Sequence, residues 1–125
     1  MENPKAQKLL NKIQRDVLKN GIVPNNIVED LKELRTYAVE ENNPLLAKVI
    51  RLTFEHIEAN ETFDIGIPED EPVDGFEEEA GADTESTPEE SLDYLLSLMA
   101  DPKNRINELE LREYCRSLRE SEEEG

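Results

Sequence analysis

The chain has 125 residues, of which 31 are acidic and 14 are basic, and its formal net charge is −17. This charge disfavours binding to DNA, RNA and anionic lipid, because the long-range field repels phosphate groups. The chain has one cysteine, which excludes an intramolecular disulfide. It shows no signal-peptide pattern, and no apolar run approaches the ~20 residues of a membrane span. We therefore expect a cytoplasmic protein.

The first helix is expected to start at the N-terminus of the chain. Asn3 followed by Pro4 fits an N-cap and a first-turn proline. Apolar residues from Ala6 to Val17 recur at the 3.6-residue spacing of an amphipathic helix. Gly21 is expected to end this helix, since glycine readily adopts positive φ after the last helical turn.

Two more amphipathic helices are expected before residue 60. The second is predicted to begin at Asn25 or Asn26, where Asn26 and Glu29 have capping-box spacing. Asn42-Asn43-Pro44 is predicted to end it and to cap a third helix, with apolar residues from Leu46 to Ile57. Because the turn is short, these two helices should be antiparallel neighbours.

A short extended strap is expected after the third helix. Phe63, Ile65 and Ile67 alternate along an otherwise polar stretch, so they could lie on the bundle. We therefore predict that residues 1–67 form a three-helix bundle with this strap.

The centre of the chain is strongly acidic. Thirteen acidic residues fall between Glu61 and Glu90, and no Lys or Arg occurs between Arg51 and Lys103. Within this stretch, residues 68–86 have low hydrophobicity, high net charge, proline and glycine, which is the composition of a disordered linker.

A helical hairpin is predicted over residues 87–120, followed by an acidic tail over 121–125. Thr87-Pro88-Glu89-Glu90 fits a capping box with proline at the first helical position. Asn107 and Glu110 fit a second capping box, flanked by Ile106 and Leu111 as a hydrophobic staple.

The apolar faces of this hairpin are the predicted partner-binding surface. At 34 residues the hairpin is shorter than the ~40 at which an unaided domain is plausible, and two helices with one apolar stripe each need a third surface. We expect that surface to come from a second copy, as a four-helix homodimer, or from a different protein, rather than from the chain's own bundle. The residues concerned are Leu92, Leu95, Leu96, Met99, Leu111, Tyr114 and Leu118.

Residues that could support catalysis or metal binding are few. His56 and Cys115 fall in different predicted units and among core-type positions, so we interpret both as structural. Asp70 and Asp74 match two positions of a calcium loop, but Gly81 stands where the bidentate glutamate is needed. We therefore expect no enzyme activity, no cofactor and no metal.

Five basic residues follow one face of the first predicted helix. They recur at spacings of three and four residues, roughly opposite the apolar stripe. This face is either a solvated outer surface or an electrostatic dock for an acidic partner or for the chain's own Glu61–Glu90. Its members are Lys5, Lys8, Lys12, Arg15 and Lys19.

The sequence thus predicts an all-α protein: a three-helix bundle, an acidic linker and a helical hairpin. We expect a non-catalytic protein–protein interaction or adaptor protein that uses apolar helix faces. The alternative is an acidic regulator or inhibitor that binds a basic, nucleic-acid-binding surface of another protein. The salt dependence of partner binding distinguishes these two functions. Electrostatic binding by an acidic regulator weakens as ionic strength rises, whereas docking through apolar helix faces persists.

Overall fold

The computed structural model describes residues 2–65 and 87–124, and over these ranges the chain is helical with no strand. The all-α prediction is confirmed. The predicted linker over 68–86 lies outside the described residues. The helices are α1 (Pro4–Asn20), α2 (Pro24–Glu40), α3 (Pro44–Asn60), α5 (Pro88–Ala100) and α6 (Arg105–Glu124).

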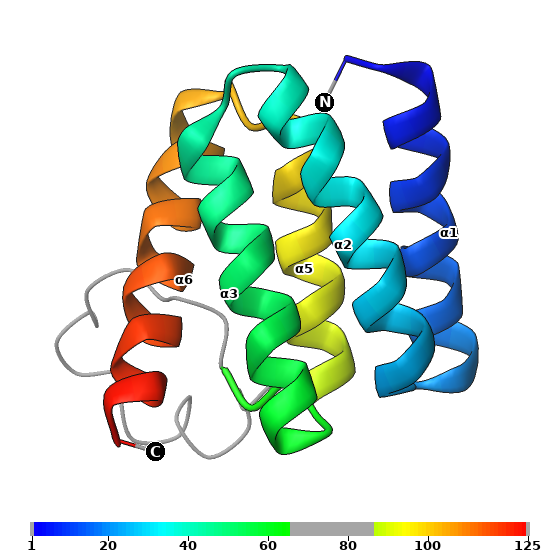
Figure 1. Cartoon of the computed structure of the whole chain (residues 1–125), viewed down its shortest axis with the longest axis vertical. Helices are drawn as coiled ribbons and strands as arrows, with labels where there is room; N and C mark the ends of the chain where they lie inside the picture. The colour runs from blue at the N-terminus through cyan, green and yellow to red at the C-terminus, as the bar shows by residue number, and fades with distance from the viewer. Residues whose placement is uncertain (1, 66–86, 125) are drawn as a thin grey trace, which may run out of the picture.

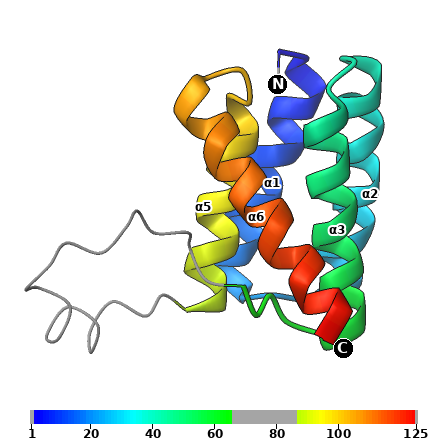
Figure 2. The same cartoon turned by 90° about the vertical axis from the view of Figure 1, so that its left-hand side faces the viewer.

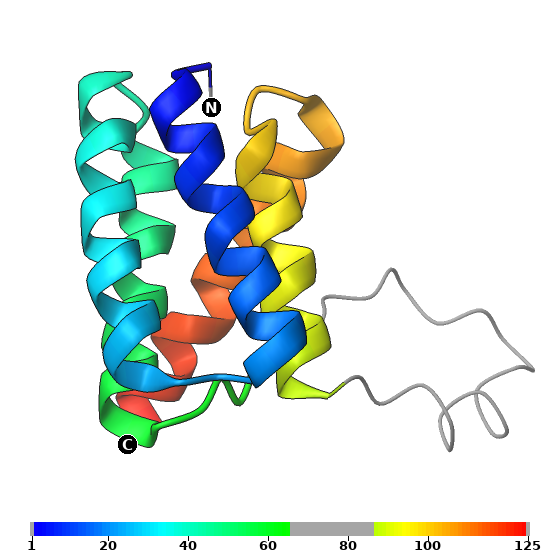
Figure 3. The ribbon, with the colours of Figure 1, turned by 90° about the vertical axis from the view of Figure 1, so that its right-hand side faces the viewer.

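The five helices pack as a closed ring around one apolar core (Figure 1). The order around the ring is α1, α2, α3, α6, α5 and back to α1. Figure 2 shows α6 between α5 and α3, and Figure 3 shows α1 (blue) between α2 (cyan) and α5 (yellow). The α5–α6 hairpin therefore closes the ring that α1–α3 leave open. The structure differs here from the expectation that the hairpin docks on another molecule.

Three of the predicted helix caps are confirmed. The Asn3 side chain accepts a hydrogen bond from the Lys5 backbone N–H at 2.8 Å, and the Asn43 side chain accepts one from the Leu46 N–H at 3.1 Å. At the start of α5, the Thr87 hydroxyl accepts a hydrogen bond from the Glu90 backbone N–H at 3.1 Å. The Glu90 carboxylate accepts one from the Thr87 backbone N–H, also at 3.1 Å. Each cap satisfies N–H groups that the first turn of a helix leaves unpaired.

The predicted start of α2 is wrong by one or two residues. The helix begins at Pro24 and its N-cap is Val23, which makes no side-chain hydrogen bond. Proline suits the first helical position because its φ is preset and the N–H that it lacks has no partner there. In this helix the proline outweighs the asparagine capping signal that follows it.

The predicted start and end of α6 also need correction. The side chain of Asn104 accepts from the backbone N–H groups of Ile106 at 2.9 Å and Asn107 at 3.2 Å, so the cap lies three residues before the predicted one. Ile106 is 66% exposed, which excludes the predicted staple. The helix continues to Glu124, so most of the predicted tail is helical.

The strap after α3 fastens α3 to both helices of the hairpin. Phe63 and Ile65 are buried as predicted, whereas Ile67 lies outside the described residues. The Ser91 hydroxyl of α5 donates to the Ile65 carbonyl oxygen at 2.5 Å. The Ser91 hydroxyl hydrogen is used in that bond, so Ser91 cannot also donate to Tyr114. The Tyr114 hydroxyl of α6 is therefore the donor to Ser91, and its oxygen lies 3.1 Å from both the carbonyl oxygen and the Oγ of Ser91.

Candidate functional site

The seven residues predicted to bind a partner lie in the interior of the chain's own ring. All are fully buried and belong to the same apolar core as α1–α3. The expected exposed apolar patch on the hairpin is therefore not present in this structure. An apolar stripe in the sequence indicates that one face of a helix is covered by other residues. For the hairpin helices α5 and α6, the covering surface comes from α1 and α3.

The polar and nucleophilic side chains of the core have structural surroundings. His56 Nε2 accepts a hydrogen bond from the Asp64 backbone N–H at 3.0 Å, which requires that nitrogen to be unprotonated and ties the strap to α3. Cys115 is buried and forms no disulfide. Burial raises the pKa of the Tyr114 hydroxyl well above its ordinary value, with the hydrogen bond to Ser91 acting in the opposite direction. The hydroxyl therefore stays protonated and serves as a donor within the core.

The basic face predicted on α1 is exposed to solvent at all five positions. One member has a structural role: Lys12 Nζ lies 2.7 Å from a carboxylate oxygen of Asp30 on α2 and 3.7 Å from one of Asp16. The hydrogen bond with Asp30 raises the pKa of Lys12 above its ordinary value. Exposed ion pairs of this kind contribute only ~0–1 kcal/mol each. Whether the face is a dock therefore stays a prediction.

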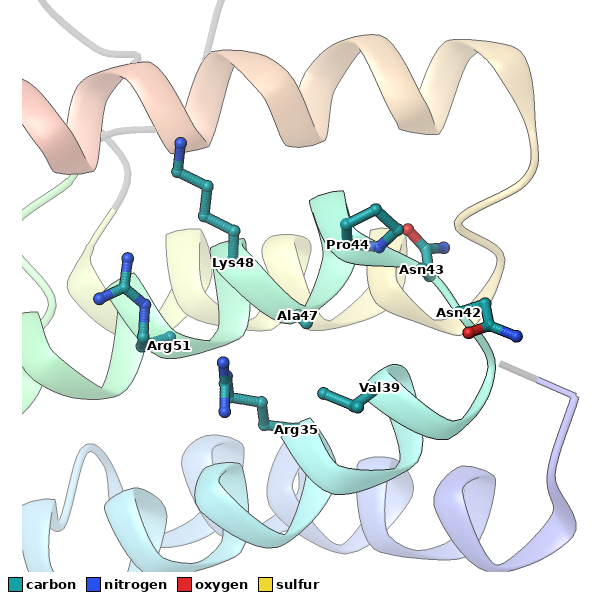
Figure 4. Close-up of a pocket in the computed structure, with 8 residues that line it drawn as sticks. All are labelled: Arg35, Val39, Asn42, Asn43, Pro44, Ala47, Lys48 and Arg51. Atoms are coloured by element: carbon teal, nitrogen blue, oxygen red, sulfur yellow. The ribbon is translucent and has the colours of Figure 1, made fainter.

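A groove between α2 and α3 combines positive charge with exposed apolar surface (Figure 4). Its volume is about 820 Å³, and it opens beside the α2–α3 turn. We call it the α2–α3 groove. It is lined by Arg35, Val39, Asn42, Asn43, Pro44, Ala47, Lys48 and Arg51.

The charge in this groove is of one sign. Three basic residues line it, and no acidic residue of ranges 2–65 and 87–124 does. Arg51 makes a long ion pair, 3.7 Å, with Glu55 one turn further along α3. An anionic group is therefore the chemically complementary ligand.

Arg35 is the one described residue with a buried side-chain polar atom that lacks a hydrogen-bond partner. Its Nε is inaccessible to solvent, and no acceptor for its hydrogen lies among the described residues. Most buried donors in proteins are paired, and leaving one unpaired costs ~1–3 kcal/mol. Figure 4 shows the Arg35 side chain extending from α2 toward α3, with Val39 on the same helix, and Lys48 and Arg51 on α3, with Lys48 extending in the direction of α6.

The groove does not appear as a charged stripe in the sequence, because its basic residues come from two different helices. In an antiparallel pair joined by a short turn, residues equally far from the turn become neighbours. Arg35 and Arg51 are such a pair, as are Val39 and Ala47. The same register places Lys32 Nζ 5.6 Å from the centre of the Phe54 ring. Reading α2 and α3 outward from Asn42-Asn43 would have found the groove.

No helix in the described part of the chain is long and apolar enough to cross a membrane. Comparison with family models, with curated proteins and with solved structures found no match.

Proposed function

We propose that this chain is a non-catalytic protein–protein interaction protein and that its docking surface is the α2–α3 groove. The observation that carries the proposal is a groove lined by three basic residues, Arg35, Lys48 and Arg51, that also exposes Val39. Arginine is among the residue types that most often contribute a large share of the binding energy at protein interfaces. The interaction surface thus moves from the hairpin faces, which are buried, to the outer face of α2 and α3.

The shape of the groove favours a macromolecular partner. Pockets for small molecules usually bury 70–90% of the ligand surface. Here Val39, on one wall, is 52% exposed, and Pro44 at the turn is exposed as well. A small ligand would keep much of its surface in water, whereas a protein segment covers such a groove and continues onto the adjoining helices.

Site-specific photo-crosslinking tests this proposal. We expect p-benzoylphenylalanine at position 39 to form a crosslinked species with a partner in lysate of the native cell. The matched control places the same group at Leu18, which is 66% exposed on α1. The crosslink at position 39 should disappear when Arg35→Gln is added. Crosslinks of equal yield at positions 18 and 39, or a crosslink that survives Arg35→Gln, would count against the groove.

The acidic-regulator function is a second candidate, supported by the charges on the bundle end opposite the α2–α3 turn. The C-terminal part of α3, the strap and the first turns of α5 carry carboxylates and no Lys or Arg. The residues are Glu55, Glu58, Glu61, Asp64, Glu89, Glu90 and Asp93. Under this candidate, capture of a basic partner falls steeply between low and moderate salt, because screened surface charges carry the affinity.

A further inference from the structure

We infer that the α2–α3 groove binds an acidic peptide segment of another protein, with a carboxylate at Arg35 and an apolar side chain against Val39 and Ala47. This inference rests on the proposed function, since it names the kind of partner for the same groove. It is carried by the charge of the groove, by the Arg35 guanidinium on its wall and by the position of its apolar residues.

The charge of the groove selects an anionic partner. In a chain with a net charge of −17, a surface lined by three cations and by no carboxylate of the described residues is a local reversal of sign. The overall charge repels an acidic partner at long range, but this repulsion is screened beyond ~8 Å at physiological salt. Contacts inside the groove act within that distance, so the local charges decide which segment stays bound.

The guanidinium of Arg35 favours a carboxylate as its ligand. A guanidinium presents parallel N–H groups that match the two oxygens of a carboxylate, and such paired hydrogen bonds are among the strongest in proteins. Arg35 lines the groove, so a carboxylate bound there would pair with the part of the guanidinium that faces the groove. Nε itself is closed to solvent and is reached only if the side chain rotates. Lys48 and Arg51 are three residues apart on α3, so both are available on one helix face for a second acidic side chain of the same segment.

The apolar residues of the groove set the sequence pattern of the peptide. Val39 follows Arg35 by one helical turn, and side chains so placed are ~5–6 Å apart. The bound segment therefore needs an acidic and an apolar side chain at that separation. Residues two apart in an extended peptide, or three to four apart in a helix, meet this requirement.

The chain's own acidic residues are the natural competitor for the groove. However, α3 ends and α5 begins at the end of the bundle opposite the α2–α3 turn, where the groove lies (Figure 1). The 17 residues of α3 span ~25 Å between these two ends. A separation of ~25 Å does not by itself exclude the chain's own segment, because the 21 residues between Ile65 and Thr87 could extend ~35 Å out and back at ~3.3–3.6 Å per residue. We assign the groove to a segment from another molecule, and the test distinguishes it from the chain's own.

The experiment measures fluorescence anisotropy of a fluorescein-labelled dodecapeptide that repeats glutamate-glutamate-leucine four times, added to the full chain at about 150 mM salt. We expect saturable binding that weakens at least tenfold with Arg35→Gln and with Arg51→Gln. The matched control, Arg116→Gln, removes the same charge from an exposed position on α6 and should change the affinity less than twofold. Circular dichroism establishes that each variant is folded. If the Arg35→Gln variant is not folded, the Lys48→Gln variant is measured in its place.

Peptide controls separate the carboxylate from charge in general. Replacing glutamate by glutamine should abolish binding, and replacing leucine by serine should weaken it several-fold. Equal binding of the glutamine peptide, or competition by millimolar inorganic phosphate as effective as by unlabelled peptide, would overturn the inference. A second comparison deletes residues 69–85 from the wild type and from the Arg35→Gln variant. The inference would be overturned if the deletion strengthened peptide binding more than tenfold in the wild type and not in the variant. The chain's own segment would then be the occupant of the groove.

The two proposals fail separately. If the peptide does not bind but position 39 crosslinks to a partner in a way that depends on Arg35, the groove is a docking surface and only the acidic-peptide assignment is wrong. If neither occurs, the proposed function is wrong as well.

Discussion

Replacing Leu96 and Leu118 together by aspartate is expected to unfold the whole chain, α1–α3 included. Both leucines are fully buried in the core that the five helices share. Placing an unpaired carboxylate in such a core costs several kcal/mol, and two of them approach or exceed the ~5–15 kcal/mol that stabilise a typical domain. Far-UV circular dichroism should show loss of most of the helical signal, and not only of the part that α5 and α6 contribute.

The matched control places the same two charges on the outer side of the same helix. Ile106 and Leu109 are both exposed, so Ile106→Asp with Leu109→Asp should leave the helical signal and the unfolding midpoint nearly unchanged. A Leu96→Asp, Leu118→Asp variant whose residues 2–65 keep a dispersed NMR spectrum would show instead that the first three helices fold without the hairpin.

Phe63→Ala is expected to lower the free energy of unfolding by about 3–5 kcal/mol, the range for a fully buried phenylalanine. Its ring lies between those of His56, at 5.7 Å and edge-on, and Tyr114, at 6.2 Å. Removing it leaves a cavity where the strap joins α3 to α6. Urea denaturation followed by circular dichroism measures the change.

Phe54→Ala provides the control for this substitution. Phe54 is half-buried on α3, with Lys32 above its ring, so its loss should cost only about 1–2 kcal/mol. Equal effects of the two substitutions would mean that the strap contributes little to stability and that Phe63 is not part of the common core.

Local sequence signals predicted most of the helices, because the atoms that decide a helix start lie within three residues of each other. Asn3, Asn43 and the Thr87–Glu90 capping box are such cases. The errors arose where two local signals competed. Pro24 precedes the asparagines that suggested a later start for α2, and Asn104 precedes the capping box suggested for α6.

The packing of the hairpin could not be predicted in the same way. An apolar stripe from Leu92 to Met99 shows that this face of a helix is covered, but its pattern is the same whether the cover is the chain's own bundle or another molecule. The tertiary signal lay in the strap, where Phe63 and Ile65 connect α3 with Ser91 and Tyr114. That hydrogen-bonded connection has no periodicity for sequence reasoning to detect.

The groove illustrates the same limit for the candidate site. Arg35 and Arg51 are sixteen positions apart and belong to different helices, so neither lies in a charged run. Their meeting follows from the short turn at Asn42-Asn43, which was predicted, and from the register of α2 against α3, which was not.

An NMR titration of the ¹⁵N-labelled chain with the acidic dodecapeptide tests most directly whether binding uses the groove or the hairpin. We predict shifts of the backbone amides of Arg35, Val39, Ala47 and Arg51 that saturate together, while the buried amides of Leu96 and Leu118 do not move. Saturating shifts along α5 and α6 with a silent α2–α3 groove would contradict the account, because the hairpin faces would then open to bind a partner.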